Sequence, residues 1–213
     1  MKVRIVRWAA AIGLTCMSAS AALAQDKFLS RYTSAGLTSP QCKQAEDGVD
    51  AMSCKGPAGW VLNVGYPAFG VTISFRHEKN HRPALTPTQG RLVFINSLAS
   101  KTATIEWRGK MRDGIFEPHA AIIRVLVLDA AQTQAMIEAG LPQPSARPAQ
   151  ILTVTRLGRE GSCLVAYVDA QTNPKPNDLA RSVADEFGPA TKCPVANVEI
   201  RGARTPVLAS YLD

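Results

Sequence analysis

The sequence predicts an α+β fold, with a mostly antiparallel sheet and one main helix near the C-terminus. Several short segments alternate between apolar and polar residues, which is typical of strands that bury one face. Only one segment carries a complete set of helix signals, from an N-terminal cap to a terminating glycine and proline. Strands and helices do not alternate regularly along the 213 residues, as they would in a parallel β-α-β arrangement.

The strand signals begin with a predicted β-hairpin over residues 60–66 and 71–75, joined by a turn at residues 67–70. The apolar residues of its first strand share one face: Trp60, Leu62, Val64 and Tyr66. The second strand alternates in the same way, with Val71, Ile73 and Phe75 pointing inward. Further strands are predicted at residues 92–95, 103–108, 121–128, 151–157 and 163–169.

The helix signals are concentrated after residue 172. Asn173 is suited to cap a helix, Pro174 to its first turn, and Gly188 followed by Pro189 to its end. The apolar stripe of this helix consists of Leu179, Ala180, Val183, Ala184 and Phe187. A second, shorter helix is predicted between residues 129 and 150, ending at Gly140. Residues 27–37 are predicted to form a short helix or an arm.

The first 24 residues are predicted to be a cleavable signal peptide. Three basic residues precede an apolar stretch at residues 8–17, and Ala22 and Ala24 occupy the two positions that a signal peptidase inspects. Cleavage after Ala24 would leave residues 25–213, which we expect to form one α+β domain in the periplasm or outside the cell. No later apolar run approaches the roughly 20 residues of a membrane span, so none is expected after cleavage.

Four cysteines follow the predicted cleavage site, and an even number in an exported chain favours disulfides. They are Cys42, Cys54, Cys163 and Cys193. Three pairings are possible, and the sequence-local pairs Cys42–Cys54 and Cys163–Cys193 are favoured. A four-thiolate zinc site is the alternative, but it needs closely spaced cysteine pairs that the sequence lacks.

Residues 77–81 (HEKNH) match the letters of the zinc-peptidase signature H-E-x-x-H. That signature needs a helix, because a separation of four residues then directs both imidazoles to one metal. Here it follows an alternating strand, and Pro83 lies two residues beyond it. We therefore expect no metal and no cofactor, and keep zinc bound by His77 and His81 as the alternative.

Glu106 and Arg124 are charged residues on two strands that would be neighbours in a hairpin. A cross-strand ion pair between them is the structural interpretation, and a ligand-binding Arg124 is the alternative. Asp169 ends another strand, where turn formation explains it better than catalysis.

Removal of the leader takes away three basic residues and no acidic one, which lowers the net charge from +7 to +4. The remaining basic residues are scattered, whereas nucleic-acid binding usually shows a clustered basic footprint, so no nucleic acid is expected as a partner. The candidate binding surface is instead aromatic: Trp60, Tyr66 and Phe69 lie in or beside tight Gly/Pro turns. Residues 171–177 are a further candidate.

Several segments resemble a group of uncharacterised exported proteins from alphaproteobacteria with two disulfides. The segments are "RYTS", the bracket from Cys42 to Cys54 followed by Gly56 and Gly59-Trp60, "IEWRG", "AAIIRV", "LTVTRLG" and "CLVAYVDAQTNPKPNDLARSVADEF". Because they are spread over most of the chain, the resemblance implies one shared, exported domain. It implies no mechanism.

These observations favour a periplasmic or secreted binding or protein-interaction module without a catalytic centre. Its expected partner is another protein or a component of the cell envelope. One alternative is an envelope hydrolase that acts through zinc at His77 and His81 or through a pocket that the sequence does not mark. Another is a structural or assembly protein of the envelope, which a self-association surface would distinguish. The sequence does not predict an oligomeric state.

Overall fold

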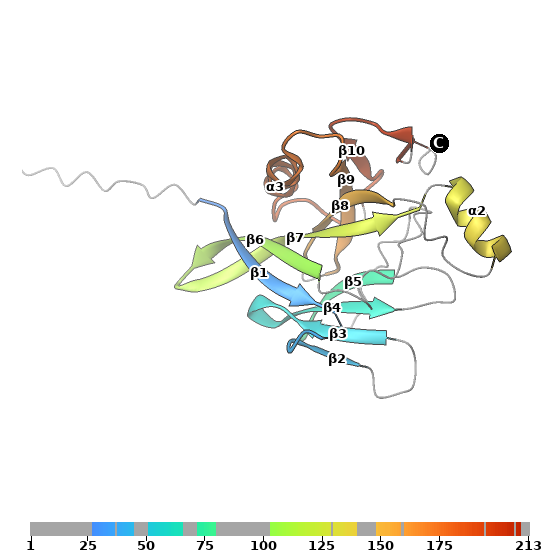
Figure 1. Cartoon of the computed structure of the whole chain (residues 1–213). Coiled ribbons are helices and arrows are strands. Elements are labelled where there is room, and N and C mark those ends of the chain that lie inside the picture. Colours follow the sequence, from blue (N-terminus) through green and yellow to red (C-terminus); the bar gives the residue numbers. More distant parts are fainter. Residues whose placement is uncertain are drawn as a thin grey trace, which may run out of the picture.

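The computed structural model describes residues 27–36, 38–44, 51–65, 72–79, 103–128, 130–139, 148–158, 160–193, 195–206 and 208–209. Within these ranges two antiparallel-rich sheets and one helix form three layers (Figure 1). The helix α3 covers one face of a six-stranded sheet, and a four-stranded sheet packs on the other face. The predicted α+β class, with a mostly antiparallel sheet and a helix near the C-terminus, is confirmed.

The six-stranded sheet is antiparallel except for its last strand, β10, which runs parallel to β9. In spatial order its strands are β1 (Leu29–Ala35), β6 (Ala103–Arg112), β7 (Ile115–Val127), β8 (Ala149–Arg156), β9 (Cys163–Asp169) and β10 (Glu199–Arg201). The four strands predicted between residues 103 and 169 are therefore confirmed, and β6 and β7 form one long hairpin.

The prediction of a helix or an arm for residues 27–37 is wrong. Leu29–Ala35 form the strand β1, which pairs with β6 from Leu29 opposite Gly109 to Ala35 opposite Ala103. Its sequence, LSRYTSA, is mostly polar because β1 is an edge strand, so the alternation that marks a half-buried strand is missing. Long-range contacts hold it instead: Trp107 Nε1 donates a 2.8 Å hydrogen bond to Thr33 Oγ1.

The four-stranded sheet is an antiparallel meander. Its strands are β2 (Cys42–Gln44), β3 (Ala51–Lys55), β4 (Trp60–Gly65) and β5 (Thr72–His77), with the 3-10 turn η1 (Pro57–Gly59) between β3 and β4. The predicted pairing of residues 60–66 with 71–75 is confirmed for β4 and β5. Tyr66, Phe69 and the strand predicted at residues 92–95 lie outside the described residues.

Two apolar cores separate the layers. The first fills the space between the sheets, where Trp107 of β6 meets Phe75 of β5 edge to face at 5.6 Å between ring centroids. Gly56 is required beside it, because a Cβ there would stand 2.3 Å from the Trp107 ring. The second core lies under α3, where Ala180, Val183 and Ala184 pack on β7, β8 and β9.

Two helices are described. The helix α2 (Ala130–Ala139) agrees with the predicted shorter helix. The helix α3 (Pro176–Glu186) begins later than predicted, because Asn173 does not cap it. The Asn173 side chain instead donates to the Asp169 carbonyl and accepts from the Ala203 amide. None of the helices in the described ranges has the length and apolar character needed to cross a membrane.

Both favoured disulfides are present, Cys42–Cys54 and Cys163–Cys193. The first joins directly opposed residues of β2 and β3. The second ties the start of β9 to the segment that follows α3, so it fastens the helix layer to the sheet. The predicted cysteine pairing is confirmed.

Candidate functional site

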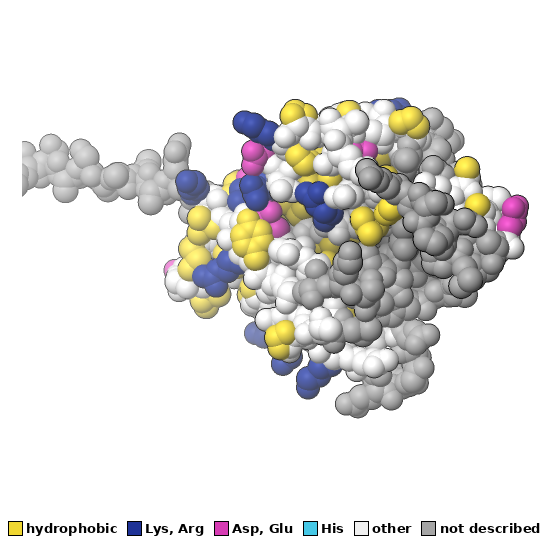
Figure 2. Space-filling view, in the orientation of Figure 1, with side chains coloured by type: hydrophobic (Ala, Val, Ile, Leu, Met, Phe, Trp, Pro, Cys, Tyr) yellow, Lys and Arg dark blue, Asp and Glu magenta, His cyan; other side chains and the backbone are white. Residues whose placement is uncertain are grey.

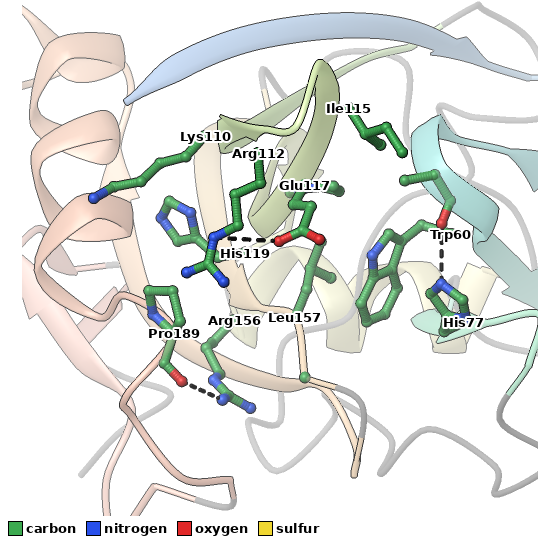
Figure 3. Close-up of a pocket in the computed structure, with 13 residues that line it drawn as sticks. Trp60, His77, Lys110, Arg112, Ile115, Glu117, His119, Arg156, Leu157 and Pro189 are labelled. Carbon is green, nitrogen blue, oxygen red and sulfur yellow. Dashed lines mark hydrogen bonds and ion pairs between the residues drawn. The ribbon is translucent and has the colours of Figure 1, made fainter. Parts of the chain in front are cut away.

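A basic cavity of about 660 Å³ opens where the two sheets meet (Figure 3). The β7–β8 ladder ends at Ala120 opposite Arg156, while β7 extends further toward Ile115, so one edge of β7 is left open here. The cavity takes its lining from this edge, the ends of β6, β8 and β5, the start of β4, and Pro189 after α3. The charged and aromatic lining residues are Trp60, His77, Lys110, Arg112, Glu117, His119 and Arg156.

The β6–β7 turn brings three of these side chains to the cavity. Asp113 and Gly114 both have positive φ, at 49° and 78°, as a two-residue type I′ hairpin turn requires. This turn lets β6 and β7 continue well beyond the predicted strands. In the strand register Lys110 therefore stands opposite Glu117, and Arg112 opposite Ile115. All four lie on the part of the hairpin that borders the cavity.

Arg156 is the most unusual group in the cavity. Its guanidinium donates to the Pro189 carbonyl at 2.9 Å and contacts the Cys193 sulfur at 3.8 Å. Its Nε is buried and has no hydrogen-bond partner within the part of the chain that the structure describes. Burial lowers the pKa of Arg156 below its usual range, an effect that the charge of Glu160 partly offsets. Among the described residues no carboxylate lies within ion-pairing distance of it. The guanidinium has therefore lost part of its hydration without gaining an anion in return.

The position of Arg156 also determines the residue type at 158. A Cβ on Gly158 would stand 1.9 Å from Arg156 Nη1 and 2.7 Å from the Gly161 carbonyl oxygen. Any larger residue would displace the guanidinium. The backbone at Gly158 and Gly161 thus leaves room for this arginine.

Arg112 and Glu117 form an ion pair at 3.4 Å on the cavity wall, and both side chains are about half exposed or more. Exposed pairs of this kind contribute at most about 1 kcal/mol, since water and salt screen them. An incoming anion can therefore replace Glu117 as the partner of Arg112 at little energetic cost.

The opposite wall is formed by Trp60 and His77, whose rings meet edge to face at 5.3 Å. Trp60, one residue of the predicted binding surface, lines this cavity. Most of its side chain is buried. The η1 turn supports the wall: Ala58, at positive φ, directs its carbonyl oxygen to His77 Nε2 at 3.0 Å. The Gly/Pro segment that the sequence marked is therefore part of the candidate site.

The HEKNH segment is not helical where it is described. His77 ends β5, and Glu78 and Lys79 form a turn; His81 lies outside the described residues. The Lys79 amide donates to His77 Nδ1 at 3.2 Å, so Nε2 carries the proton and donates to Ala58. Both nitrogens of this ring are engaged. Within the described ranges no three His, Cys, Asp or Glu side chains come together as a metal site.

His119 lies at the back of the cavity and is buried. Its Nε2 donates to the Ala184 carbonyl of α3 at 3.1 Å and lies 4.0 Å from an oxygen of Asp185. Burial lowers the pKa of His119 from 6.5, although the Ala184 carbonyl and the charge of Asp185 act in the opposite direction. Arg108 and Lys110 lower it further. The imidazole is therefore held neutral near neutral pH.

Stability is expected to fall as the pH decreases through 6.5. Because the folded-state pKa of His119 is lowered, the unfolded chain binds more protons below that value, and acid favours unfolding. Urea midpoints at about pH 7.5 and about pH 5 measure this for wild type and for His119→Gln. The loss should be smaller in the variant. An equal loss in both proteins would show that His119 does not contribute to it.

The other face of the six-stranded sheet carries a second cavity of about 410 Å³ under α3, with Arg124 and Glu106 in its lining. The predicted Glu106–Arg124 ion pair is wrong. Glu106 stands opposite Ile122 and pairs with Arg181 of α3 at 2.6 Å, because the helix places that guanidinium directly over it. Arg124 instead donates to Gln150 and to Asn177. The charged groups of this cavity are thus already partnered.

Asp169 has the turn-forming role that the sequence predicts. Its Oδ1 accepts hydrogen bonds from the amides of Gln171 and Thr172, both at 2.8 Å. Burial raises the pKa of this carboxyl, but the hydrogen bonds from Thr172 and Gln171 lower it further than burial raises it. The carboxylate is therefore held by the loop before α3.

The sequence did not identify Lys110, Arg112, Glu117, His119 or Arg156 as site residues. Only the Asp113-Gly114 turn gave a usable signal, since it predicts that the hairpin continues to residue 112. Comparisons with protein-family models, with curated proteins and with solved structures found no match.

Proposed function

We propose that this protein is an exported, non-enzymatic binding module that takes a small anionic ligand in the basic cavity. The observation that carries the proposal is Arg156, a partly dehydrated guanidinium whose Nε has no hydrogen-bond partner among the described residues. A carboxylate or phosphate group supplies the charge-assisted hydrogen bonds that such a group lacks. An anionic group on an envelope component has the same chemistry as a free small molecule.

The rest of the lining supports the same ligand class. Arg112 also lines the cavity, on the side that faces Trp60 and His77 in Figure 3, and its ion pair with Glu117 is exposed. Trp60 adds an apolar wall, which suits a ligand with a carbon skeleton beside its anionic group. The cavity under α3 is the weaker candidate, since Glu106 and Arg181 pair with each other there. Arg124 is likewise bonded, to Gln150 and Asn177.

Export is part of the proposal. Two disulfides are compatible with an oxidising compartment. Export is also favoured by the predicted leader, with cleavage after Ala24, and by the resemblance to exported proteins. We infer a periplasmic or secreted location for residues 25–213.

The test is an NMR titration of the mature protein with inorganic phosphate and with citrate, using glucose as an uncharged control. We expect amide shifts at Leu157 and Gly158 with both anions and none with glucose. Arg156→Met should weaken anion binding by about tenfold or more, because charge-assisted hydrogen bonds contribute about 1.5–3 kcal/mol.

The matched control is Arg124→Met, which removes a guanidinium from the other cavity. It should bind both anions like wild type. If Arg124→Met loses binding and Arg156→Met retains it, the ligand site is the cavity under α3. If neither anion shifts any cavity amide, the proposed function is wrong.

A further inference from the structure

Large exposed apolar side chains are gathered at one end of the six-stranded sheet. Among the described residues four such side chains are more than a third exposed: Leu29 (39%), Tyr32 (56%), Met111 (38%) and Ile115 (62%). Leu29, Met111 and Ile115 lie at the start of β1 or beside the β6–β7 turn, whereas Tyr32 stands opposite Glu106 and accepts a hydrogen bond from Arg181 of α3. In Figure 2 yellow side chains lie among dark blue ones at the left of the molecule, the side on which Figure 1 shows the β6–β7 turn.

The strand register places Leu29, Met111 and Ile115 at one end of the sheet. Leu29 stands opposite Gly109, two residues before Met111 on β6, and Ile115 stands opposite Arg112 across the turn. The start of β1 and the tip of the hairpin therefore lie at the same end of the sheet. The turn projects beyond the other strands in Figure 1.

Basic residues surround these apolar side chains. This end carries four basic residues and two acidic ones. The basic residues are Lys27, Arg31, Lys110 and Arg112, and the acidic ones are Asp113 and Glu117. Arg31 lies 4.9 Å from the centroid of the Phe116 ring, and Lys110 lies 4.6 Å from that of Phe28. The cations are thus placed directly beside apolar groups. We call the set Lys27, Leu29, Arg31, Lys110, Met111, Arg112 and Ile115 the hairpin end.

We propose that the hairpin end docks on the surface of a bilayer that contains anionic phospholipid. Apolar side chains at the tip of a hairpin enter the boundary between headgroups and acyl chains, while the surrounding Lys and Arg contact anionic headgroups. The inference goes beyond the proposed ligand binding, because Leu29, Arg31 and Met111 do not line the basic cavity.

The position of the leader supports this occupant. Lys27, where the described chain begins, is three residues after the predicted cleavage site at Ala24. In the precursor the apolar residues 8–17 would therefore join the domain at the hairpin end.

The test is co-sedimentation of the mature protein with vesicles of phosphatidylcholine alone and with about 30% phosphatidylglycerol. We expect sedimentation with the anionic vesicles at low salt, and its loss as salt screens the cations. Leu29→Ser combined with Met111→Ser should weaken vesicle binding by about tenfold, from the apolar area removed. Arg31→Gln should weaken it by about fivefold, as expected for one basic residue near the surface.

The control is Lys43→Gln, which removes an exposed cation from β2 in the other sheet. It should sediment like wild type. An equal loss of vesicle binding for Lys43→Gln and Arg31→Gln would contradict the proposal, because it would show that only the net charge of the protein matters. Absence of sedimentation with the anionic vesicles would overturn it, and so would equal sedimentation with phosphatidylcholine alone.

Phosphate binding measured on the same protein samples distinguishes a failure of this inference from a failure of the proposed function. The Leu29→Ser and Met111→Ser double variant is expected to retain phosphate binding at the basic cavity. A loss of phosphate binding together with vesicle binding would indicate a damaged fold, which circular dichroism and the urea midpoint would detect. Leu29→Ala with Met111→Ala is then the milder pair, and it should still weaken vesicle binding if the proposal holds.

Discussion

Replacing Asp185 with alanine is expected to lower the free energy of unfolding by about 3 kcal/mol, because it leaves a nearly buried arginine without its carboxylate. Asp185 of α3 receives hydrogen bonds from both Nε and Nη2 of Arg108, at 3.0 and 2.5 Å. The Arg108 side chain is only 11% exposed, and its remaining side-chain bond is to the Ser30 hydroxyl. Urea unfolding at neutral pH measures the loss.

Asp178→Ala is the matched control for this substitution. Asp178 lies on the same helix and also pairs with an arginine, Arg181, at 3.0 Å, but its side chain is 65% exposed. We expect a change within about 0.5 kcal/mol, as for other exposed pairs on a helix. Similar losses for the two aspartates would mean that burial of Arg108 does not determine the effect.

Removing the Cys163–Cys193 disulfide is expected to lower the free energy of unfolding by about 3.5 kcal/mol, according to the chain-entropy model. The bond closes a loop with a sequence separation of 30 and fastens the exit of α3 to β9. Alanine at both positions avoids placing a buried hydroxyl at Cys163, which is 6% exposed. The urea midpoint of the double variant should fall well below that of the oxidised wild type.

The control for the disulfide is the matching pair of alanines at Cys42 and Cys54. This bond closes a shorter loop, with a separation of 12, and the same model gives about 3 kcal/mol. Both double variants should therefore be less stable than wild type, with the Cys163–Cys193 variant the lower. An unchanged midpoint in that variant would show that contacts under α3 alone hold the helix layer.

Several strands were predictable because the apolar residues that they direct into the first core alternate with polar ones on the other face. Trp60, Leu62 and Val64 follow this alternation, and so do Ile105 and Trp107. The polar strand β1 was missed because an edge strand gains its stability from a partner about 74 residues away, as in the Trp107–Thr33 hydrogen bond. The continuation of β6 and β7 was readable from Asp113-Gly114, since that dipeptide favours a type I′ turn.

The charged contacts were less predictable than the strands. Glu106 was assigned to Arg124 on the neighbouring strand, but α3 supplies Arg181 from 75 residues away. The direction in which a helix packs on a sheet is not encoded near either residue. Arg156 was missed for a related reason. Its loss of hydration arises only when the end of β8, Gly158 and the Pro189 segment come together in the folded chain.

The bond between Cys42 and Cys54 has a consequence for how the chain reaches its fold. Because these residues face each other across β2 and β3, the oxidised chain retains a nucleus with the correct strand alignment even when it is unfolded. A slip by one residue would turn Met52 out of the first core, and the covalent bond prevents that error. The order of oxidation and collapse thus decides whether the four-stranded sheet starts from an aligned pair of strands or must search for one.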